Sequence, residues 1–389
     1  MTRSLYPPSC RELFCAFLEL GAISFGGPAI VAYMRQLVVE RRAWLDDASF
    51  ARGAALCQIV PGAISVQMAY YVGMQLRGMK GGCACCAGYV LAPFLFVLLL
   101  SVAYVKFRHV PASASVVRNL HLLVIALLAH AAYMFGRTSL RCPAQWALAI
   151  GSVCLFGAGL HPIAVIVCAG SIGYLIKKET HYPLLPEAFC ARAYPRQWIS
   201  IAGFAAGITL FFICLFVYHR QLFELGLLMC KIDLFAFGGG YTSVPLMVHE
   251  IVRVRNLLDI ATLLDGIAIG QITPGPVALT ATFIGYLLYG LPGAVVATVC
   301  VFLPSCIIIA VCLPSYERVL GHAGLQRIAD GIVCSFVGLI TWTTVLLGVQ
   351  IQWSIAHLLW AGALLFGLLS GISVPLIVGA GVVGAIVMA

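Results

Sequence analysis

Charged residues are scarce in this chain, at 10% of 389 positions against about 25% in a typical soluble domain. Residues 266–316 and 331–389 contain no Asp, Glu, Lys or Arg, and 62% of the whole chain is hydrophobic. About 20 apolar residues suffice for a helix to cross the hydrocarbon core of a bilayer. A soluble core cannot bury such long apolar stretches, so the sequence predicts an all-α polytopic protein embedded in lipid.

Motifs for nucleotide and enzyme chemistry are also missing. No Gly is followed by Lys, which excludes a Walker A loop, and neither His-Glu-x-x-His nor Gly-x-Ser-x-Gly occurs. His121 and His130 are nine residues apart on one expected helix and face opposite sides, so they do not form a metal-ligand pair. We therefore expect no enzymatic activity, no direct use of ATP, no metal and no cofactor.

The net charge of +9 follows a topological pattern. Most Lys and Arg precede residue 200 and lie between apolar stretches, as charges that set membrane topology do, so no nucleic-acid partner is expected. Residues 10–19 carry charges and no small-residue cleavage site follows them, so no cleavable signal is expected. The 16 cysteines are scattered through apolar stretches, which argues against a disulfide framework. Cys83, Cys85 and Cys86 form one tight group, and a membrane-embedded thiol or metal reductase built on them is the alternative from a different functional class.

The chain contains an internal repeat. Phe-Gly-Gly-Pro at 25–28 returns as Phe-Gly-Gly-Gly at 237–240, and Gln-Ile-Val-Pro-Gly at 58–62 returns as Gln-Ile-Thr-Pro-Gly at 271–275. The repeated positions are Gly and Pro inside apolar segments, where they break helices. Broken helices at corresponding places of two halves point to the binding site of a secondary transporter.

The repeat defines the domain organisation. Residues 1–176 form a first repeat and 219–389 a second, while 177–218 hold a polar linker (177–196) and one unpaired apolar segment (197–218). Each repeat is predicted to contain six apolar elements. They cover roughly 13–34, 53–76, 83–105, 117–136, 144–156 and 162–176 in the first half, and 222–247, 262–289, 291–313, 327–350, 354–369 and 372–388 in the second.

One unpaired crossing inverts the second half if each half crosses an even number of times. Positive-inside counting then predicts a cell-membrane protein with a cytoplasmic N-terminus and an external C-terminus. The first two elements of each half either span the membrane or are re-entrant hairpins. We favour hairpins, because they move Arg35, Arg41, Arg42 and Arg52 to the cytoplasmic side.

The breaks have a common chemistry. Non-helical backbone at membrane depth must be buried in protein or line a polar cavity. A helix that begins at such a break presents free N–H groups and roughly half a positive charge. Four converging helix ends supply about +2, which matches a divalent oxyanion without an Arg or Lys at the bilayer centre.

These residues resemble the chromate ion transporter family over nearly the whole chain. The resemblance rests on 25–28, on Trp44 and Leu45 after two arginines, on Pro61-Gly62, and on 271–276 with Phe-Ile-Gly-Tyr at 283–286. It implies a two-domain member that exports chromate, with sulfate as a look-alike, driven by the proton gradient. Two positions depart from the pattern: Asp233 stands where Gly is expected, as at Gly21, and Leu257-Leu258 replaces Trp44-Leu45.

The candidate substrate-binding residues lie at or beside the four breaks. They are Gly26, Gly27, Gln58, Pro61, Gly62, Gly238, Gly239, Gly240, Tyr241, Thr242, Gln271, Thr273, Pro274 and Gly275. Other nearby hydroxyls and amides, at Ser24, Ser65, Gln67, Ser243 and Thr280, are weaker candidates, because a hydroxyl in a membrane helix usually bonds its own backbone.

Three ionisable residues are predicted at membrane depth and are candidates for proton coupling: Glu19, Lys231 and Asp233. Glu19 and Lys231 occupy equivalent repeat positions, so a two-fold axis would bring them close together. The predicted function is secondary transport of chromate that confers chromate resistance. Sulfate or another oxyanion is the alternative substrate, and sulfate is the expected competitor. The oligomeric state stays open, with a homodimer among the alternatives.

Overall fold

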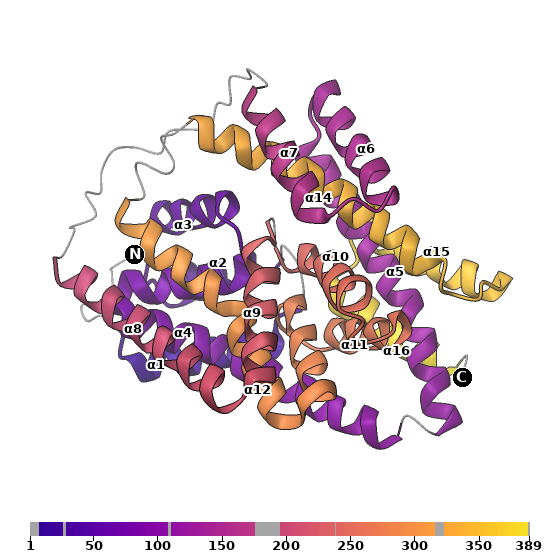
Figure 1. Cartoon of the computed structure of the whole chain (residues 1–389), viewed down its shortest axis with the longest axis horizontal. Helices are drawn as coiled ribbons and strands as arrows, with labels where there is room; N and C mark the ends of the chain where they lie inside the picture. The colour runs from indigo at the N-terminus through magenta and orange to yellow at the C-terminus, as the bar shows by residue number, and fades with distance from the viewer. Residues whose placement is uncertain are drawn as a thin grey trace.

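The computed structural model describes residues 8–25, 29–107, 110–175, 195–237, 239–315 and 323–387. Within these ranges the chain is helical and has no strand, as predicted (Figure 1). The first half contains α1 (Cys10–Ile23), α2 (Ala29–Arg35), the π-helix η1 (Gln36–Arg41), α3 (Asp47–Ile59), α4 (Ile64–Phe107), α5 (Pro111–Ser139), α6 (Pro143–Gly157) and α7 (Pro162–Leu175).

The second half repeats this order. It contains α9 (Arg220–Leu234), η2 (Gly240–Thr242), α10 (Ser243–Met247), the π-helix η3 (Val248–Val254), α11 (Ile260–Ile272), η4 (Val277–Leu279), α12 (Thr280–Cys312), η5 (Leu313–Ser315), α14 (Ala323–Gly348), α15 (Ile355–Leu369) and α16 (Val374–Val387). Five helical stretches are long and apolar enough to cross a membrane by length and composition, at 64–107, 116–139, 201–218, 277–312 and 324–348.

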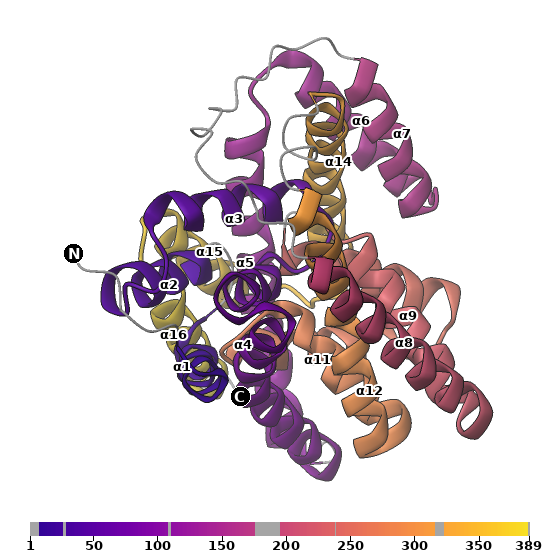
Figure 2. The ribbon, with the colours of Figure 1, turned by 90° about the vertical axis from the view of Figure 1, so that its left-hand side faces the viewer.

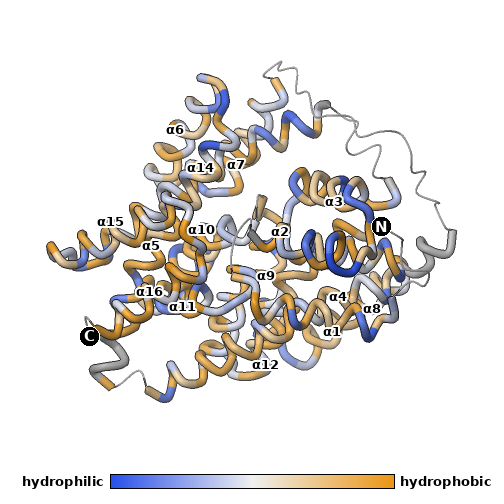
Figure 3. The backbone as a smooth tube through the Cα atoms, turned by 180° about the vertical axis from the view of Figure 1, so that it is seen from behind, coloured by the Kyte–Doolittle hydropathy of each residue, from blue (hydrophilic) through white to orange (hydrophobic). Residues whose placement is uncertain are grey.

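The predicted unpaired segment is a helix, α8 (Pro195–Tyr218). It lies alongside α9 at one edge of the molecule (Figure 2). Only 6% of its most apolar window is buried, so its hydrophobic surface faces outward. Figure 3 shows that most of the chain is hydrophobic, with hydrophilic residues gathered around α3 and the N-terminal end. Most of the predicted linker, 177–194, lies outside the described residues.

The predicted breaks are confirmed. The first element divides into α1 and α2, and the second divides after Ile59, where Pro61 and Gly62 interrupt the helix before Ile64. In the second half α9 and α10 are separated at 235–239, and α11 ends before Pro274. Gly62 and Gly275 have φ values of 124° and 103°, a conformation that favours glycine. Whether these elements span the bilayer or are re-entrant stays a prediction.

Each half also contains a tight helical turn. Gly78 in α4 and Gly290 in α12 have nearly the same backbone, with φ of 63° and 61°. Gly73 and Gly81 would lie about 12 Å apart in a straight helix. A Cβ on Gly73 would instead lie 2.1 Å from the Gly81 carbonyl oxygen, so α4 folds back on itself at Gly78. The second and third predicted elements are therefore the two arms of this turn.

The two halves clasp each other. Helix α14 of the second half packs against α6 and α7 of the first, and α5 of the first packs against α15 and α16 of the second (Figure 1). Helices α4 and α12 also pack together, one from each half. Contacts that are exchanged in this reciprocal way are those of two copies related by a two-fold axis.

Local details follow the same symmetry. Ala43 and Asn256 both adopt a left-handed conformation, with φ of 49° and 50°. Trp44 N–H donates to the Val38 carbonyl, and Leu257 N–H donates to the equivalent Ile251 carbonyl. The replacement of Trp44-Leu45 by Leu257-Leu258 therefore leaves the backbone of this loop unchanged.

Candidate functional site

The breaks of the two halves are joined by a pair of reciprocal hydrogen bonds. Gly62 N–H donates to the Ala236 carbonyl oxygen at 2.7 Å, and Gly275 N–H donates to the Ser24 carbonyl oxygen at 2.6 Å. Ser24 and Ala236 occupy equivalent repeat positions, as do Gly62 and Gly275. Phe25 and Gly275 also form an isolated parallel bridge. The Pro-Gly break of each half is thus fastened to the Gly-rich break of the other.

The glycines at these breaks are required by close approach. A Cβ on Gly62 would lie 2.2 Å from Ser305 Oγ, and one on Gly275 would lie 2.6 Å from the Pro93 side chain. Ser305 and Pro93 are themselves equivalent, so the packing is symmetric although the chemistry differs.

Gly239 and Gly240 lie where elements of both halves meet. Gly239 has φ of 117°, and the closest atom to a Cβ there would be Ile64 Cδ1 at 3.9 Å, at the start of α4. A Cβ on Gly240 would lie 3.3 Å from the backbone nitrogen of Val277, which begins the short helix before α12. The N–H groups of Val277 and Ala278 have no acceptor within the described chain. Free backbone donors therefore lie beside this glycine turn.

Asp233, on α9 of the second half, lies at the start of α4 in the first half. Its carboxylate accepts the Ala63 N–H at 3.2 Å, the Ser305 N–H at 2.9 Å and the Ser305 hydroxyl at 2.7 Å. The residue is only 1% exposed. Ala63 directly precedes α4, so Asp233 places a negative charge at the positive end of that helix. Gly21 has no such side chain, because a Cβ there would lie 2.2 Å from the Tyr89 carbonyl oxygen.

Several buried donors beside the breaks have no hydrogen-bond partner in the described ranges. They are the Ser24 and Tyr89 hydroxyls, which lie close to each other, and the Gln271 side-chain amide nitrogen; the Gln67 amide oxygen beside Pro61 is a buried acceptor that also lacks a partner there. Buried polar groups in folded proteins are normally bonded, so orphan donors of this kind suggest a missing acceptor. Gln271 is buried, whereas its repeat partner Gln58 is exposed on α3, so the structure does not place the two alike.

The remaining predicted residues divide into three groups. Gly26, Gly27 and Gly238 lie outside the described residues. Tyr241 is buried, and Pro61 and Pro274 are partly buried at their breaks. The Thr242 and Thr273 hydroxyls donate to the Gly239 and Gly270 carbonyls, and those of Ser243 and Thr280 donate to Gly240 and Val277. These hydroxyl protons are committed to the backbone.

The expected pairing of Glu19 with Lys231 is wrong. Glu19 is exposed on α1, and Lys231 Nζ instead forms an ion pair with Glu250 Oε1 at 2.7 Å. The physical reason is that η3 brings a buried acid to Lys231 in its own half. The sequence position of Glu250, just before two arginines, gave it the appearance of a loop residue.

Asp265 was also missed. It lies on α11 and bonds the Tyr104 hydroxyl and His121 Nε2, both at 2.7 Å, across the boundary between the halves. An acid inside an otherwise apolar segment is itself a signal of a buried partner, and that signal was present in the sequence.

One group of side chains has the composition of a metal site. One potential ligand atom from each of His161, His249 and Glu250 lies within 4.8 Å of the others. Lys231 already pairs with Glu250, which competes with a cation at this position. The predicted cysteine group is divided: Cys83 is exposed, Cys85 is buried, and Cys86 Sγ lies 3.6 Å from Cys306 Sγ of the other half.

The fold and its symmetric breaks define a polytopic helical membrane protein built from two copies of one repeat. The sequence model of the family described as "Chromate transporter" matches residues 11–174 and 223–386, one match within each predicted repeat. The chain therefore belongs to the chromate transporter family, and the resemblance seen in its motifs is confirmed.

Relatives of known name share most of the chain. An uncharacterized transporter of Methanocaldococcus jannaschii is 38% identical over 90% of this chain and 88% of its own length. A chromate transport protein of Cupriavidus metallidurans is 29% identical over 87% of this chain and 82% of its own. A probable chromate transport protein of Synechococcus elongatus is also 29% identical, over 88% and 85%. No solved structure matches the chain.

Proposed function

We propose that this protein is a secondary transporter that exports chromate and confers chromate resistance. Membership of the chromate transporter family supports transport of this ion, and the names of the relatives from Cupriavidus and Synechococcus point the same way. The observation that carries the proposal is the place where the Gly-rich break of each half meets the Pro-Gly break of the other, which we call the crossing. There the backbone N–H groups of Val277 and Ala278, beside Gly240, have no acceptor within the described residues. A tetrahedral dianion offers the acceptors that these donors lack.

The membrane potential supplies the direction. Moving one charge through 100 mV is worth about 2.3 kcal/mol, so a dianion leaving a cell that is negative inside gains roughly 4.6 kcal/mol per 100 mV. Proton pumping maintains that potential, so export is driven by the proton gradient without a nucleotide site in the transporter.

Asp233 is the residue we propose for proton linkage. Its carboxylate shares the Ala63 N–H at the start of α4 with the Ser305 hydroxyl oxygen, and its negative charge there repels a second anion. A proton on Asp233 removes that charge and weakens its hold on the N–H group. Protonation therefore favours anion binding in this arrangement. A proton that left with the dianion would reduce the exported charge from two to one, and the electrical gain to about 2.3 kcal/mol per 100 mV, which still favours export. Exposed Glu19 and paired Lys231 are not positioned for this role.

The first prediction concerns flux. Everted vesicles that contain the protein should accumulate labelled chromate when energised, and a protonophore should abolish the accumulation. Sulfate in excess should compete, and the ratio of the two apparent affinities measures selectivity. Flux that requires ATP and ignores the gradient would exclude the mechanism.

Replacing Cys83, Cys85 and Cys86 by serine should leave most of the flux, whereas a thiol reductase would lose its activity.

The second prediction concerns the glycine turn. Gly239→Val should reduce chromate flux at least tenfold, because a β-branched residue at φ of 117° is strained by about 1–3 kcal/mol and screens the N–H groups. The matched control is Gly203→Val on α8, where a Cβ meets no atom within 4 Å. Both variants should insert at wild-type levels in a membrane blot. Normal flux in well-inserted Gly239→Val would remove this turn from the site.

The third prediction concerns Asp233. Asp233→Asn keeps an acceptor oxygen for the backbone but removes the charge, so chromate binding should no longer strengthen as the pH falls. Equilibrium binding to purified protein, from mildly alkaline to mildly acidic pH, measures this dependence. Glu224→Gln is the control, because Glu224 is exposed and pairs only with Arg220 on its own helix. An unchanged pH profile in Asp233→Asn would contradict the assignment.

The fourth prediction concerns orientation. We propose that the two-fold axis lies in the membrane plane, so that the halves are inverted and the breaks approach the midplane from opposite faces. The reciprocal contacts of α5 and α14 support the axis, and the unpaired helix α8 supports the inversion. Reporter fusions should place the N-terminus in the cytoplasm and the end after Ala389 outside. Both ends on one side would refute the inverted arrangement.

A further inference from the structure

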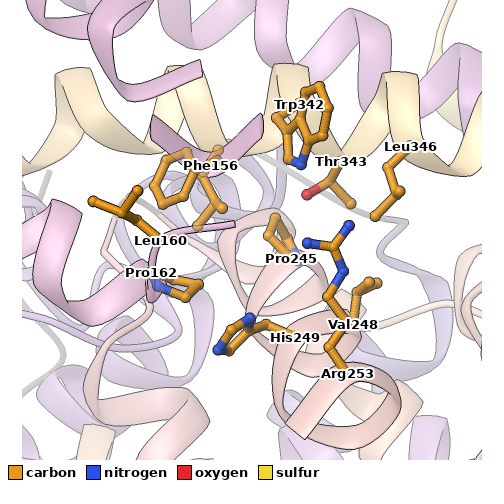
Figure 4. Close-up of a pocket in the computed structure, with 11 residues that line it drawn as sticks. Phe156, Leu160, Pro162, Pro245, Val248, His249, Arg253, Trp342, Thr343 and Leu346 are labelled. Carbon is orange, nitrogen blue, oxygen red and sulfur yellow. The ribbon is translucent and has the colours of Figure 1, made fainter. Parts of the chain in front are cut away.

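A small cavity that is open to solvent lies apart from the crossing, between the α6–α7 turn, η3 and α14 (Figure 4). Its wall includes Pro245 and Val248 on one side and Trp342 and Thr343 on the other. Pro245 follows Gly240 by five residues through η2 and α10, a helical rise of roughly 8 Å. The cavity is therefore close to the glycine turn without being part of it.

The polar groups of this cavity include three hydrogen-bond donors, beside His249, whose unpartnered ring nitrogen can donate or accept. Trp342 Nε1, which can only donate, is buried with no partner in the described chain. Thr343 is 3% exposed, and its hydroxyl forms no hydrogen bond within the described residues, although Thr341 and Thr344 both bond their own helix. Arg253 forms no ion pair within those ranges. Figure 4 shows the guanidinium, the indole nitrogen and the threonine hydroxyl turned toward the same space.

The charge around the cavity favours an anion. No Asp or Glu is among the residues that line it. Glu250 follows the lining residue His249, but Lys231 compensates its charge at 2.7 Å. A guanidinium, an indole N–H and a hydroxyl together match the acceptor oxygens of a tetrahedral oxyanion, and an unpaired Arg near them raises the local anion concentration.

The equivalent place in the first half has a different chemistry. The repeat partner of Arg253 is Glu40, which is already paired with Arg35, and the partners of Trp342 and Thr343 are His130 and Ala131. The donor set thus belongs to one half only. The two halves are otherwise similar, so this set of donors is an asymmetric feature of the second half.

We infer that Arg253, Trp342 and Thr343 form a second, outer binding site for a tetrahedral divalent oxyanion, through which the ion passes between the bulk solution and the crossing. This rests on the proposed anion transport for its role, and on the donors alone for its ligand. The site gathers the ion by charge and holds it by hydrogen bonds until the glycine turn becomes accessible.

Binding is tested first without transport. Sulfate, which does not absorb in the tryptophan range, is titrated into purified protein while intrinsic fluorescence is followed, with chloride at equal ionic strength as the blank. The wild type should give a saturable change that Trp342→Phe lacks, although five other tryptophans remain. Arg253→Gln should shift the midpoint roughly tenfold higher, since a charged hydrogen bond is lost. A wild-type response that survives intact in Trp342→Phe would overturn the site.

Flux separates this site from the crossing. Arg253→Gln and Thr343→Val should each raise the KM for chromate several-fold when chromate is supplied on the side to which the cavity opens. The maximal flux should stay unchanged, because an outer site affects capture only. The matched controls are Arg255→Gln, an exposed arginine outside the cavity, and Thr344→Val, whose hydroxyl bonds Ile340. An unchanged KM in both test variants would overturn the role in transport. If the wild type transports no oxyanion, the proposed function fails, and the fluorescence titration still decides the site.

Discussion

The structure depends on how it satisfies backbone polar groups where helices stop inside the protein. An unbonded amide at membrane depth costs several kcal/mol, and only partners within the protein can remove that cost. The two bonds from Gly62 to Ala236 and from Gly275 to Ser24 provide such partners across the repeat boundary. Neither half can close its own Pro-Gly break in this way. The breaks thus hold the two repeats together while they leave other N–H groups available for a ligand.

The residues proposed for proton linkage and for the outer anion site lie at positions where the two repeats differ. Gly21 packs against the Tyr89 backbone and the Pro93 side chain, while Asp233 and Ser305, equivalent to Gly21 and Pro93, form a buried polar cluster at the start of α4. A perfectly symmetric transporter would bind its substrate identically from both sides. An acid in one half and the Arg253–Trp342–Thr343 set in the same half distinguish the two routes to the crossing, which is what a transporter with a preferred direction needs.

The sequence was sufficient to predict the repeat, the broken helices, the unpaired helix and the family, because Gly and Pro act locally and apolar length is a direct requirement of the bilayer. It was insufficient for partners that only the three-dimensional arrangement determines. Gln58 and Gln271 look equivalent in sequence, yet one is exposed and the other buried. Lys231 was assigned to Glu19 by repeat position, whereas the π-helix η3 delivers Glu250 to it. A π-helix widens the turn, and the hydrophobic pattern of the sequence does not signal that change of register.

The clasp between the halves has a consequence for biosynthesis. Helix α5 is made before the second repeat, whereas the helices that cover it, α15 and α16, follow α14 in the chain. Until α15 and α16 are made, the surface of α5 that they cover can contact lipid, because the segment is apolar. The surfaces of α6 and α7 that α14 covers likewise stay uncovered until α14 is made. The packing of the first repeat is therefore complete only after α16 has been made, so a chain truncated before α15 lacks contacts in both halves.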